Sequence, residues 1–315
     1  MVEKLYSYYF FTCCEMKEYQ ISFWTPGTIL PKNQQLFGCA SHGFAIASNW
    51  VGPEMGEYSF WDKTIIGSVY SGTYEQVLSS LGNCGFVPRV CVVFFRKSMG
   101  MERFILKFTE ILPDVPIIGG GAAIGEGQNM GDVIPLAEEV VLLAAAEGDF
   151  KLESLNIYDE TDIRVEINKT SDREFDKVRL LPDGNWQPAL DFLYQQKETR
   201  GIRQDDFESL TFHDHNRRNV HCSIKGDRIV SGADLPENGR LALCLVNRSE
   251  ATLRLAEFMS KEQSLIIGCA GIRSLVQKPL ITGNQSLAGF LFGELVTCKN
   301  QPMFGNLMLA RLSPK

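Results

Sequence analysis

Residues 265–271 read Leu-Ile-Ile-Gly-Cys-Ala-Gly, an apolar run that stops at glycine and small residues. The same construction recurs in Leu36-Phe37-Gly38-Cys39-Ala40, in Ile117-Ile118-Gly119-Gly120-Gly121-Ala122 and in Phe290-Leu291-Phe292-Gly293-Glu294. A run of β-branched and aromatic residues that ends in glycine predicts a buried strand leading into a tight turn, because glycine tolerates positive φ and close backbone approach. Binding pockets favour such strand ends, so we expect a site where these turns meet.

The composition is that of an ordinary globular protein, with 315 residues, 44% hydrophobic and 22% charged. A net charge of −7 without clustered Lys and Arg argues against a nucleic-acid partner. No apolar run is long enough to span a bilayer and the N-terminus lacks a secretory cleavage site, so no membrane association is expected. The nine cysteines have no regular spacing, which predicts reduced thiols and a cytoplasmic location.

Hydrophobic periodicity predicts many strands and few helices. Helices are expected at 74–81, 98–112 (with Ser98 as N-cap), 189–196 and 249–259 (with Ser249 as N-cap), and strands at 65–70, 87–95, 115–122, 140–146, 207–212, 220–224, 228–230, 240–246 and 304–312. This mixture predicts an α/β (α+β) fold, a layered sandwich of mixed sheets in two domains of related size.

The glycine-rich segment from Gly119 to Gly131 is expected to be a loop, and it invites comparison with phosphate-binding loops. It has no Gly-Lys-Ser/Thr, and Ile124 or Met130 stands where a dinucleotide fingerprint needs glycine. A structural tight turn is the favoured interpretation.

Three histidines and a cysteine lie close together in His213, His215, His221 and Cys222. Imidazole and thiolate suit zinc or iron, so this segment is the alternative metal site, with haem as one form of it. A polar hairpin explains the same residues without metal, and we expect no metal or cofactor in the main interpretation.

Cys39 and Cys269 each follow a glycine at a strand end, where a nucleophile could be exposed. A catalytic cysteine needs a histidine base and an orienting group. His42 is near Cys39, but no orienting partner can be assigned. A cysteine-dependent enzyme therefore stays the less favoured alternative, and we expect a non-enzymatic protein.

The glycine-ended stretches also carry a resemblance to the FIST family of sensory proteins, which have paired N-terminal and C-terminal FIST domains. The resemblance implies an N-terminal FIST-like domain at residues 1–184 and a C-terminal FIST-like domain at residues 185–315. The segments similar to family motifs are Val115 to Ala123, Gly184 to Leu193, Gly268-Cys269-Ala270-Gly271-Ile272-Arg273 and Ala288 to Leu295. Their order agrees with the family from about residue 36 onward. Residues 1–35 are shorter than the family's usual start, and of its His-Asn-x-Thr run only Asn306 remains.

The resemblance implies an intracellular small-molecule-sensing module that works with a signalling partner of the kinase or chemoreceptor type. It also implies haem as a ligand in some relatives, and a ubiquitin-ligase substrate receptor in one eukaryotic branch. The expected ligand is small and polar, such as an amino acid. The residues expected to bind it are Gly119, Gly120, Gly121, Cys269, Arg273, Glu294 and Asn306, with Cys39 and His42. Glycine N–H groups and Arg273 would hold its carboxylate, and Glu294 its amine.

Overall fold

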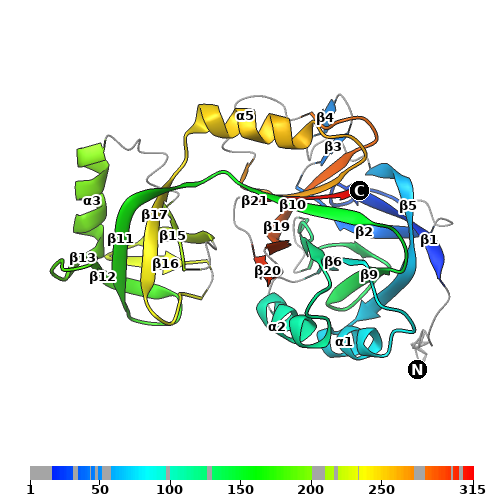
Figure 1. Ribbon diagram of the computed structural model, residues 1–315, viewed down its shortest axis with the longest axis horizontal. Helices are drawn as coiled ribbons and strands as arrows, with labels where there is room; N and C mark the ends of the chain where they lie inside the picture. The colour runs from blue at the N-terminus through cyan, green and yellow to red at the C-terminus, as the bar shows by residue number, and fades with distance from the viewer. Residues whose placement is uncertain are drawn as a thin grey trace, which may run out of the picture.

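The computed structural model describes residues 16–30, 35–42, 44–46, 49–51, 58–96, 100–125, 130–200, 210–215, 219–232, 234–272, 281–298, 301–304 and 308–315. Figure 1 shows two lobes, a large twisted sheet and a smaller barrel, with helix α5 (Arg248–Met259) above the space between them. The expected mixed α/β class with few helices is confirmed.

The large lobe is one mixed sheet made from both ends of the chain. Its first strands are β1 (Lys17–Trp24), β2 (Leu36–Ala40), β3 (Phe44–Ile46), β4 (Asn49–Val51), β5 (Tyr58–Gly72), β6 (Val90–Phe95), β7 (Ile117–Gly121), β8 (Val133–Ile134), β9 (Val140–Ala145) and β10 (Phe150–Asn156). Its last strands are β18 (Leu265–Cys269), β19 (Leu287–Cys298), β20 (Gln301–Phe304) and β21 (Met308–Pro314). Within the described residues the strand order is β10-β21-β18-β19-β7-β6-β9-β5-β1-β2-β8, with β20, β3 and β4 attached beside β19.

Strand β19 belongs to two parts of this sheet. Its first half pairs in parallel with β18 and antiparallel with β3, whereas its second half pairs antiparallel with β7 and β20. The change of partners falls between Leu291 and Phe292. The two parts of the sheet therefore meet at one short segment of one strand.

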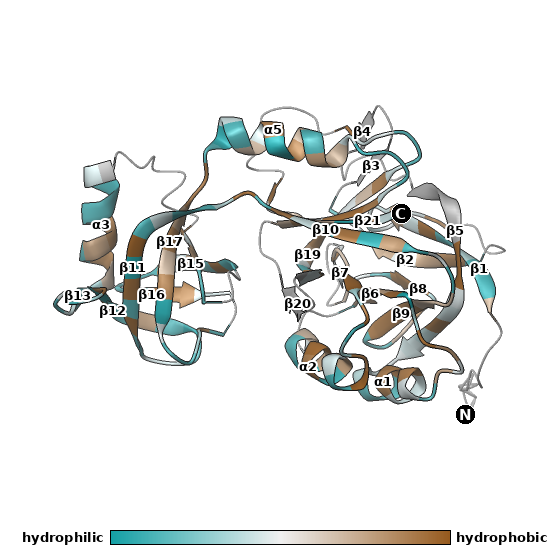
Figure 2. Ribbon diagram, viewed as in Figure 1, coloured by the Kyte–Doolittle hydropathy of each residue, from teal (hydrophilic) through white to brown (hydrophobic). Residues whose placement is uncertain are grey.

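Helices α1 (Tyr74–Gly82) and α2 (Met101–Ile111) cover one face of the large sheet, at the bottom of Figure 1. The apolar faces of both helices pack on β6, β7 and β9, whose own residues are almost all buried. Figure 2 shows the matching apolar colour in these strands. Helix α1 begins with a capping box made by Thr73 and Gln76. Helix α2 begins after Gly100, not at Ser98, which lies outside the described residues.

The small lobe is a closed barrel. Its strands are β11 (Asp159–Lys169), β12 (Glu174–Leu180), β13 (Gln187–Pro188), β14 (Leu210–His213), β15 (Asn219–Lys225), β16 (Arg228–Ser231) and β17 (Arg240–Leu245). They follow the order β11-β17-β14-β15-β16-β12, and β12 pairs with β11 to close the ring. Helix α3 (Ala189–Arg200) contributes Phe192 and Leu193 to the barrel core.

The barrel is an insertion into the path of the large sheet, between β10 and β18. The expected domain boundary at residue 184 falls inside it, between β12 and β13, so the two sheets do not divide the chain there. That boundary was implied by the resemblance to paired FIST domains, whereas β21 returns to pair with β10 across the whole barrel insertion.

Helix α5 lies over a hydrophobic cluster that contains residues from both lobes. Leu255 and Met259 of α5 pack there with Tyr158 at the start of the barrel and with Phe290 of the large sheet. The helix is capped by Asn247, whose side chain accepts the N–H of Glu250 at 3.2 Å, and not by the expected Ser249. Within the described residues, no helix is both long enough and apolar enough to cross a membrane.

Candidate functional site

The four glycine-ended stretches do converge in the structure. The N–H of His42, after β2, donates to the carbonyl of Phe290 in β19 at 2.9 Å. Ala123, after β7, donates to Ala40 at 2.8 Å, and Ala270, after β18, donates to Leu291 at 2.8 Å. Each stretch is thus hydrogen-bonded to another, and β19 is the strand that most of them share.

A bulge in β19 shapes the centre of this convergence. The pairing of β19 with β7 shifts register between Phe292 and Leu295, and Gly293 within the bulge has φ +54°. Opposite it, a Cβ at Gly120 would lie 3.1 Å from Leu291 Cβ and 3.4 Å from Glu294 Cα. The bulge needs this close approach, and it leaves Phe292 45% exposed while Glu294 is fully buried.

Glu294 is a buried carboxyl with incomplete hydrogen bonding. One oxygen, Oε1, accepts the N–H of Met308 at 2.8 Å. The thiol of Cys269 and the N–H of Glu294 itself also hydrogen-bond to this carboxyl group. Within the part of the chain that the structure describes, the other oxygen, Oε2, accepts no hydrogen bond.

Burial raises the pKa of Glu294 to about 7, because desolvation disfavours the ionised form. The N–H groups of Met308 and Glu294 and the Cys269 thiol oppose this shift and keep it from being larger. A carboxyl with this pKa changes charge near neutral pH, and carboxyls of this kind are concentrated at functional sites.

Of the residues expected to bind a ligand, Cys269 and Glu294 are in contact with each other. The other expected residues either lie outside the described residues or make different contacts. Arg273 and Asn306 lie outside the described residues. His42 packs its ring edge-on against Phe292, with ring centroids 4.1 Å apart, and its backbone ties β2 to β19. Cys39 is fully buried in the core of the large sheet.

Gly119, Gly120 and Gly121 are residues of strand β7, within the strand expected at 115–122, so the loop expected from Gly119 begins only after them. This strand pairs with β6 on one edge and with β19 on the other. Strand pairing therefore competes for the N–H groups that were expected to hold a ligand carboxylate. The glycines are needed instead for close packing, since a Cβ at Gly119 would lie 1.8 Å from the carbonyl oxygen of Val93.

The geometry also argues against Cys39 as a nucleophile. Its side chain has no exposed surface, and burial raises the pKa of its thiol well above the usual range. A nucleophilic cysteine needs an accessible thiolate. Cys269 is also buried, at 7% exposure, and its thiol hydrogen-bonds to Glu294.

The residues proposed as a metal site are divided by the barrel wall. His221 and Cys222 are neighbours in β15 and so point to opposite faces; Cys222 lies in the barrel core. His221 contacts Thr211 at 3.2 Å, and burial lowers the pKa of its imidazole. His215 is exposed beyond the end of β14. No group of three metal-ligating side chains occurs among the described residues.

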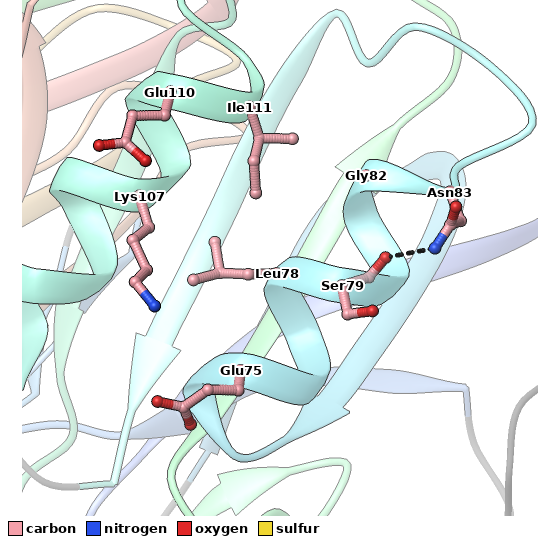
Figure 3. Close-up of a pocket in the computed structure, with 8 residues that line it drawn as sticks. All are labelled: Glu75, Leu78, Ser79, Gly82, Asn83, Lys107, Glu110 and Ile111. Carbon is pink, nitrogen blue, oxygen red and sulfur yellow. Dashed lines mark hydrogen bonds between the residues drawn. The ribbon is translucent and has the colours of Figure 1, made fainter.

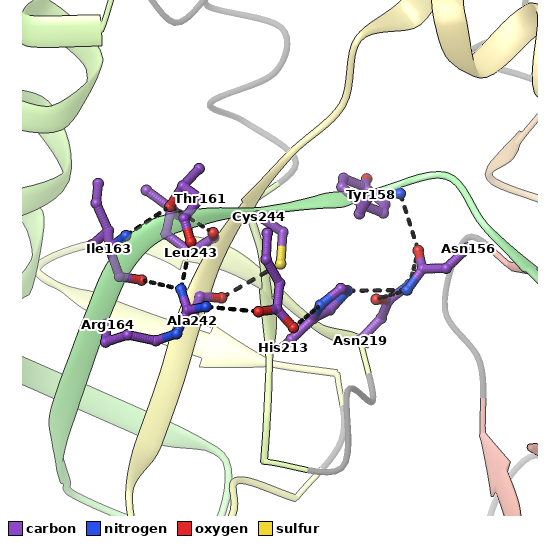
Figure 4. Close-up of polar contacts among 11 residues, drawn as sticks. Asn156, Tyr158, Thr161, Ile163, Arg164, His213, Asn219, Ala242, Leu243 and Cys244 are labelled. Atoms are coloured by element: carbon purple, nitrogen blue, oxygen red, sulfur yellow. Dashed lines mark hydrogen bonds and ion pairs between the residues drawn. The ribbon is translucent and has the colours of Figure 1, made fainter. Parts of the chain in front are cut away.

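His213 instead joins a polar network where the chain crosses from the large sheet into the barrel (Figure 4). Asn156 Oδ1 accepts the N–H of Tyr158 at 3.0 Å, so its Nδ2 faces His213 Nε2, at 3.0 Å. Nε2 is therefore the acceptor, and Nδ1 carries the proton that points to Glu160 Oε1 at 3.0 Å. A metal at either ring nitrogen would have to displace one of these partners.

Arg164 and Asn219 complete this network. Arg164 bridges to Glu160 Oε2 at 2.8 Å, and Asn219 exchanges hydrogen bonds with Asn156. No local pattern predicts this network, because Asn156 and Glu160 lie more than fifty positions from His213 and follow no motif. The arrangement fixes the crossing between the lobes.

A shallow groove of about 490 Å³ lies between α1 and α2 (Figure 3). Leu78 and Ile111 form its floor, and Glu75, Lys107 and Glu110 lie along its sides. Glu294 does not line it, and none of its polar lining residues is buried. We assign no function to it.

The comparisons with known proteins leave the family open: no protein-family model matches the chain, and no curated protein shows significant sequence similarity to it.

Proposed function

We propose that this chain is a small-molecule-sensing module whose ligand donates a hydrogen bond or an ammonium group to Glu294. The observation that carries the proposal is the buried Oε2 atom of Glu294, which has no partner among the described residues. An unpaired buried carboxylate oxygen costs stability that a ligand donor would recover. The resemblance to sensory proteins supports the same interpretation.

The surroundings of Glu294 favour an amine over a neutral ligand. Phe292, two positions earlier in the chain, is 45% exposed and packs against the His42 ring. Aromatic faces attract cations, and a carboxylate pairs with them. An ammonium group at Oε2 would thus pair with an ionised Glu294, and the exposed Phe292 would offer an aromatic surface two residues earlier in the same strand.

A free amino acid fits this proposal if a cation holds its carboxylate, and Arg273 remains the residue expected to do so. The Glu294 part of the proposal does not depend on it, because a simple amine needs only the carboxylate. Comparing amino acids with the corresponding decarboxylated amines therefore tests the role of Glu294 and the role of Arg273 separately. A signalling partner would then recognise the ligand-bound form of the chain.

The test is a thermal-shift screen of amino acids and the corresponding amines with wild type and Glu294→Gln. A ligand that binds only the folded state stabilises it by about 2.7 kcal/mol at a hundredfold excess over Kd. Wild type should respond to at least one amine, and Glu294→Gln should lose that response. Because Glu294 has a pKa of about 7, the wild-type response should be stronger at pH 8 than at pH 6.

Glu139→Gln is the matched control, since Glu139 Oε2 accepts the N–H of Tyr74 at 2.9 Å at the start of α1, away from the site. This variant should keep the full ligand response. The proposal fails if no amine or amino acid stabilises the wild type, or if Glu294→Gln responds as strongly as Glu139→Gln.

A further inference from the structure

Strand β10 forms one end of the large sheet and has an open edge. It pairs with β21, and no other strand of the described chain pairs with it. The N–H of Lys315 donates to the carbonyl of Asp149 at 2.9 Å, which continues the β10–β21 register by one position. In an antiparallel pair the hydrogen-bonded positions alternate, so odd-numbered residues of β10 bond to β21.

The even-numbered residues therefore present their N–H and C=O groups to the open edge. These are Phe150, Leu152 and Ser154, whereas the carbonyl of Asn156 is already bonded by Arg254. Three residues thus offer backbone hydrogen-bonding groups at the open edge. Phe150 and Leu152 also pack against the core of the large sheet, so this edge is continuous with that core.

The charged side chains of β10 are arranged so that an antiparallel copy of the same strand can place opposite charges across from each other. Lys151 and Glu153 flank Leu152, and they form an exposed ion pair at 2.9 Å within the chain. Glu153 is also held by Arg311, which contacts it from β21. If a second copy of β10 runs antiparallel with Leu152 opposite Leu152, each Lys151 faces the partner's Glu153.

Other registers of the same pairing do not have this property. A two-fold axis at Lys151 would place two lysines opposite each other, and one at Glu153 would place two glutamates opposite each other. Like charges directly across a sheet destabilise the pairing, and unlike charges stabilise it. Only the axis at Leu152 satisfies the three open backbone positions and both charges together, with Phe150 opposite the partner's Ser154.

We propose that a second copy of this chain docks on β10, forming a two-fold symmetric dimer with one continuous sheet. The symmetric charge order favours a copy of the same chain over an unrelated strand, because an isologous contact requires a surface to complement itself. Glu294 is not one of the residues of this edge, so the dimer can be tested without any ligand.

The test measures the mass of the full chain by sedimentation equilibrium over a range of concentrations. Wild type should be a dimer. Lys151→Glu would place two glutamates opposite each other twice, and should raise the dimer dissociation constant by roughly tenfold or more. Ser154→Pro removes an edge N–H that β21 does not use, and should also weaken the dimer.

Lys177→Glu makes the same change in net charge at an exposed position of β12, and should remain dimeric. Circular dichroism checks that each variant is folded. A wild type that stays monomeric at high concentration would overturn the proposal. So would folded Lys151→Glu and Ser154→Pro variants that both dimerise as tightly as Lys177→Glu.

Discussion

Replacing Glu294 with glutamine should stabilise the protein, and increasingly so as pH rises. The folded protein holds the Glu294 proton more tightly than the unfolded chain does, because burial raises the pKa from 4.5 to about 7. The favourable contribution of this group is therefore fully present below about pH 4.5 and is lost as pH rises to 7. The shift corresponds to about 3 kcal/mol in the free energy of unfolding, at about 1.4 kcal/mol per pKa unit.

Glutamine keeps the shape of the side chain and can still accept the Met308 N–H through Oε1, but it never ionises. Like protonated Glu294, it carries a donor where Oε2 now lies. The difference in the free energy of unfolding between the two proteins therefore reports the ionisation of Glu294 and not a change in packing. Glu294→Gln and wild type should be close in stability at pH 5, and their difference should grow by about 2.5 kcal/mol by pH 8.

Urea denaturation of both proteins at pH 5, 6, 7 and 8 measures this difference directly. Titrations shared by the two proteins cancel in the comparison, and Glu139→Gln controls for loss of a carboxylate elsewhere. A difference that stays constant or narrows as pH rises would refute the reasoning. It would mean that Glu294 is solvated or already paired with a cation in the folded protein.

Three further outcomes test other features of the structure. Gly293→Ala should destabilise by about 1–2 kcal/mol in urea denaturation because its φ is +54°, whereas Gly82→Ala, at the end of α1, should be neutral or stabilising; equal effects would contradict the bulge geometry. His213→Ala should cost about 1–3 kcal/mol because it removes the ring nitrogens that pair with Asn156 Nδ2 and Glu160 Oε1, and exposed His215→Ala should cost less than about 0.5 kcal/mol. Cys39 should resist alkylation in the folded protein and react after denaturation, as read by mass spectrometry; rapid native labelling would contradict its burial.

Local patterns in the sequence predicted the strands and helices well. The strand expected at 87–95 forms at Val90–Phe95, where every residue is buried, and the helix expected at 98–112 forms at Met101–Ile111, with Phe104 and Phe108 buried. Both signals depend on residues a few positions apart. The N-cap at Asn247 was missed because Asn, Arg and Ser follow one another there, and only the local backbone path decides which of them caps the helix.

Long-range pairing was beyond this kind of reasoning. Val165 pairs with both Leu180 and Leu241, and nothing in the alternation of β11 indicates that these two contacts close a barrel. The same limit applies to the candidate site. The turn at Gly293 and the acidic residue beside it were visible in the sequence, but the bulge that buries Glu294 depends on β7, which lies far away in the chain.

The position of β19 has a consequence for synthesis on the ribosome. Strands β7 and β3 pair with β19, and β10 pairs with β21, so the sheet begun by the first part of the chain is completed only by residues 287–314. The barrel closes within residues 159–245 and can fold earlier. Chains emerge at roughly 5–20 residues per second, so the partly built sheet must wait several seconds with open strand edges. Chaperones that shield strand edges should therefore matter most for the nascent chain after the barrel has formed.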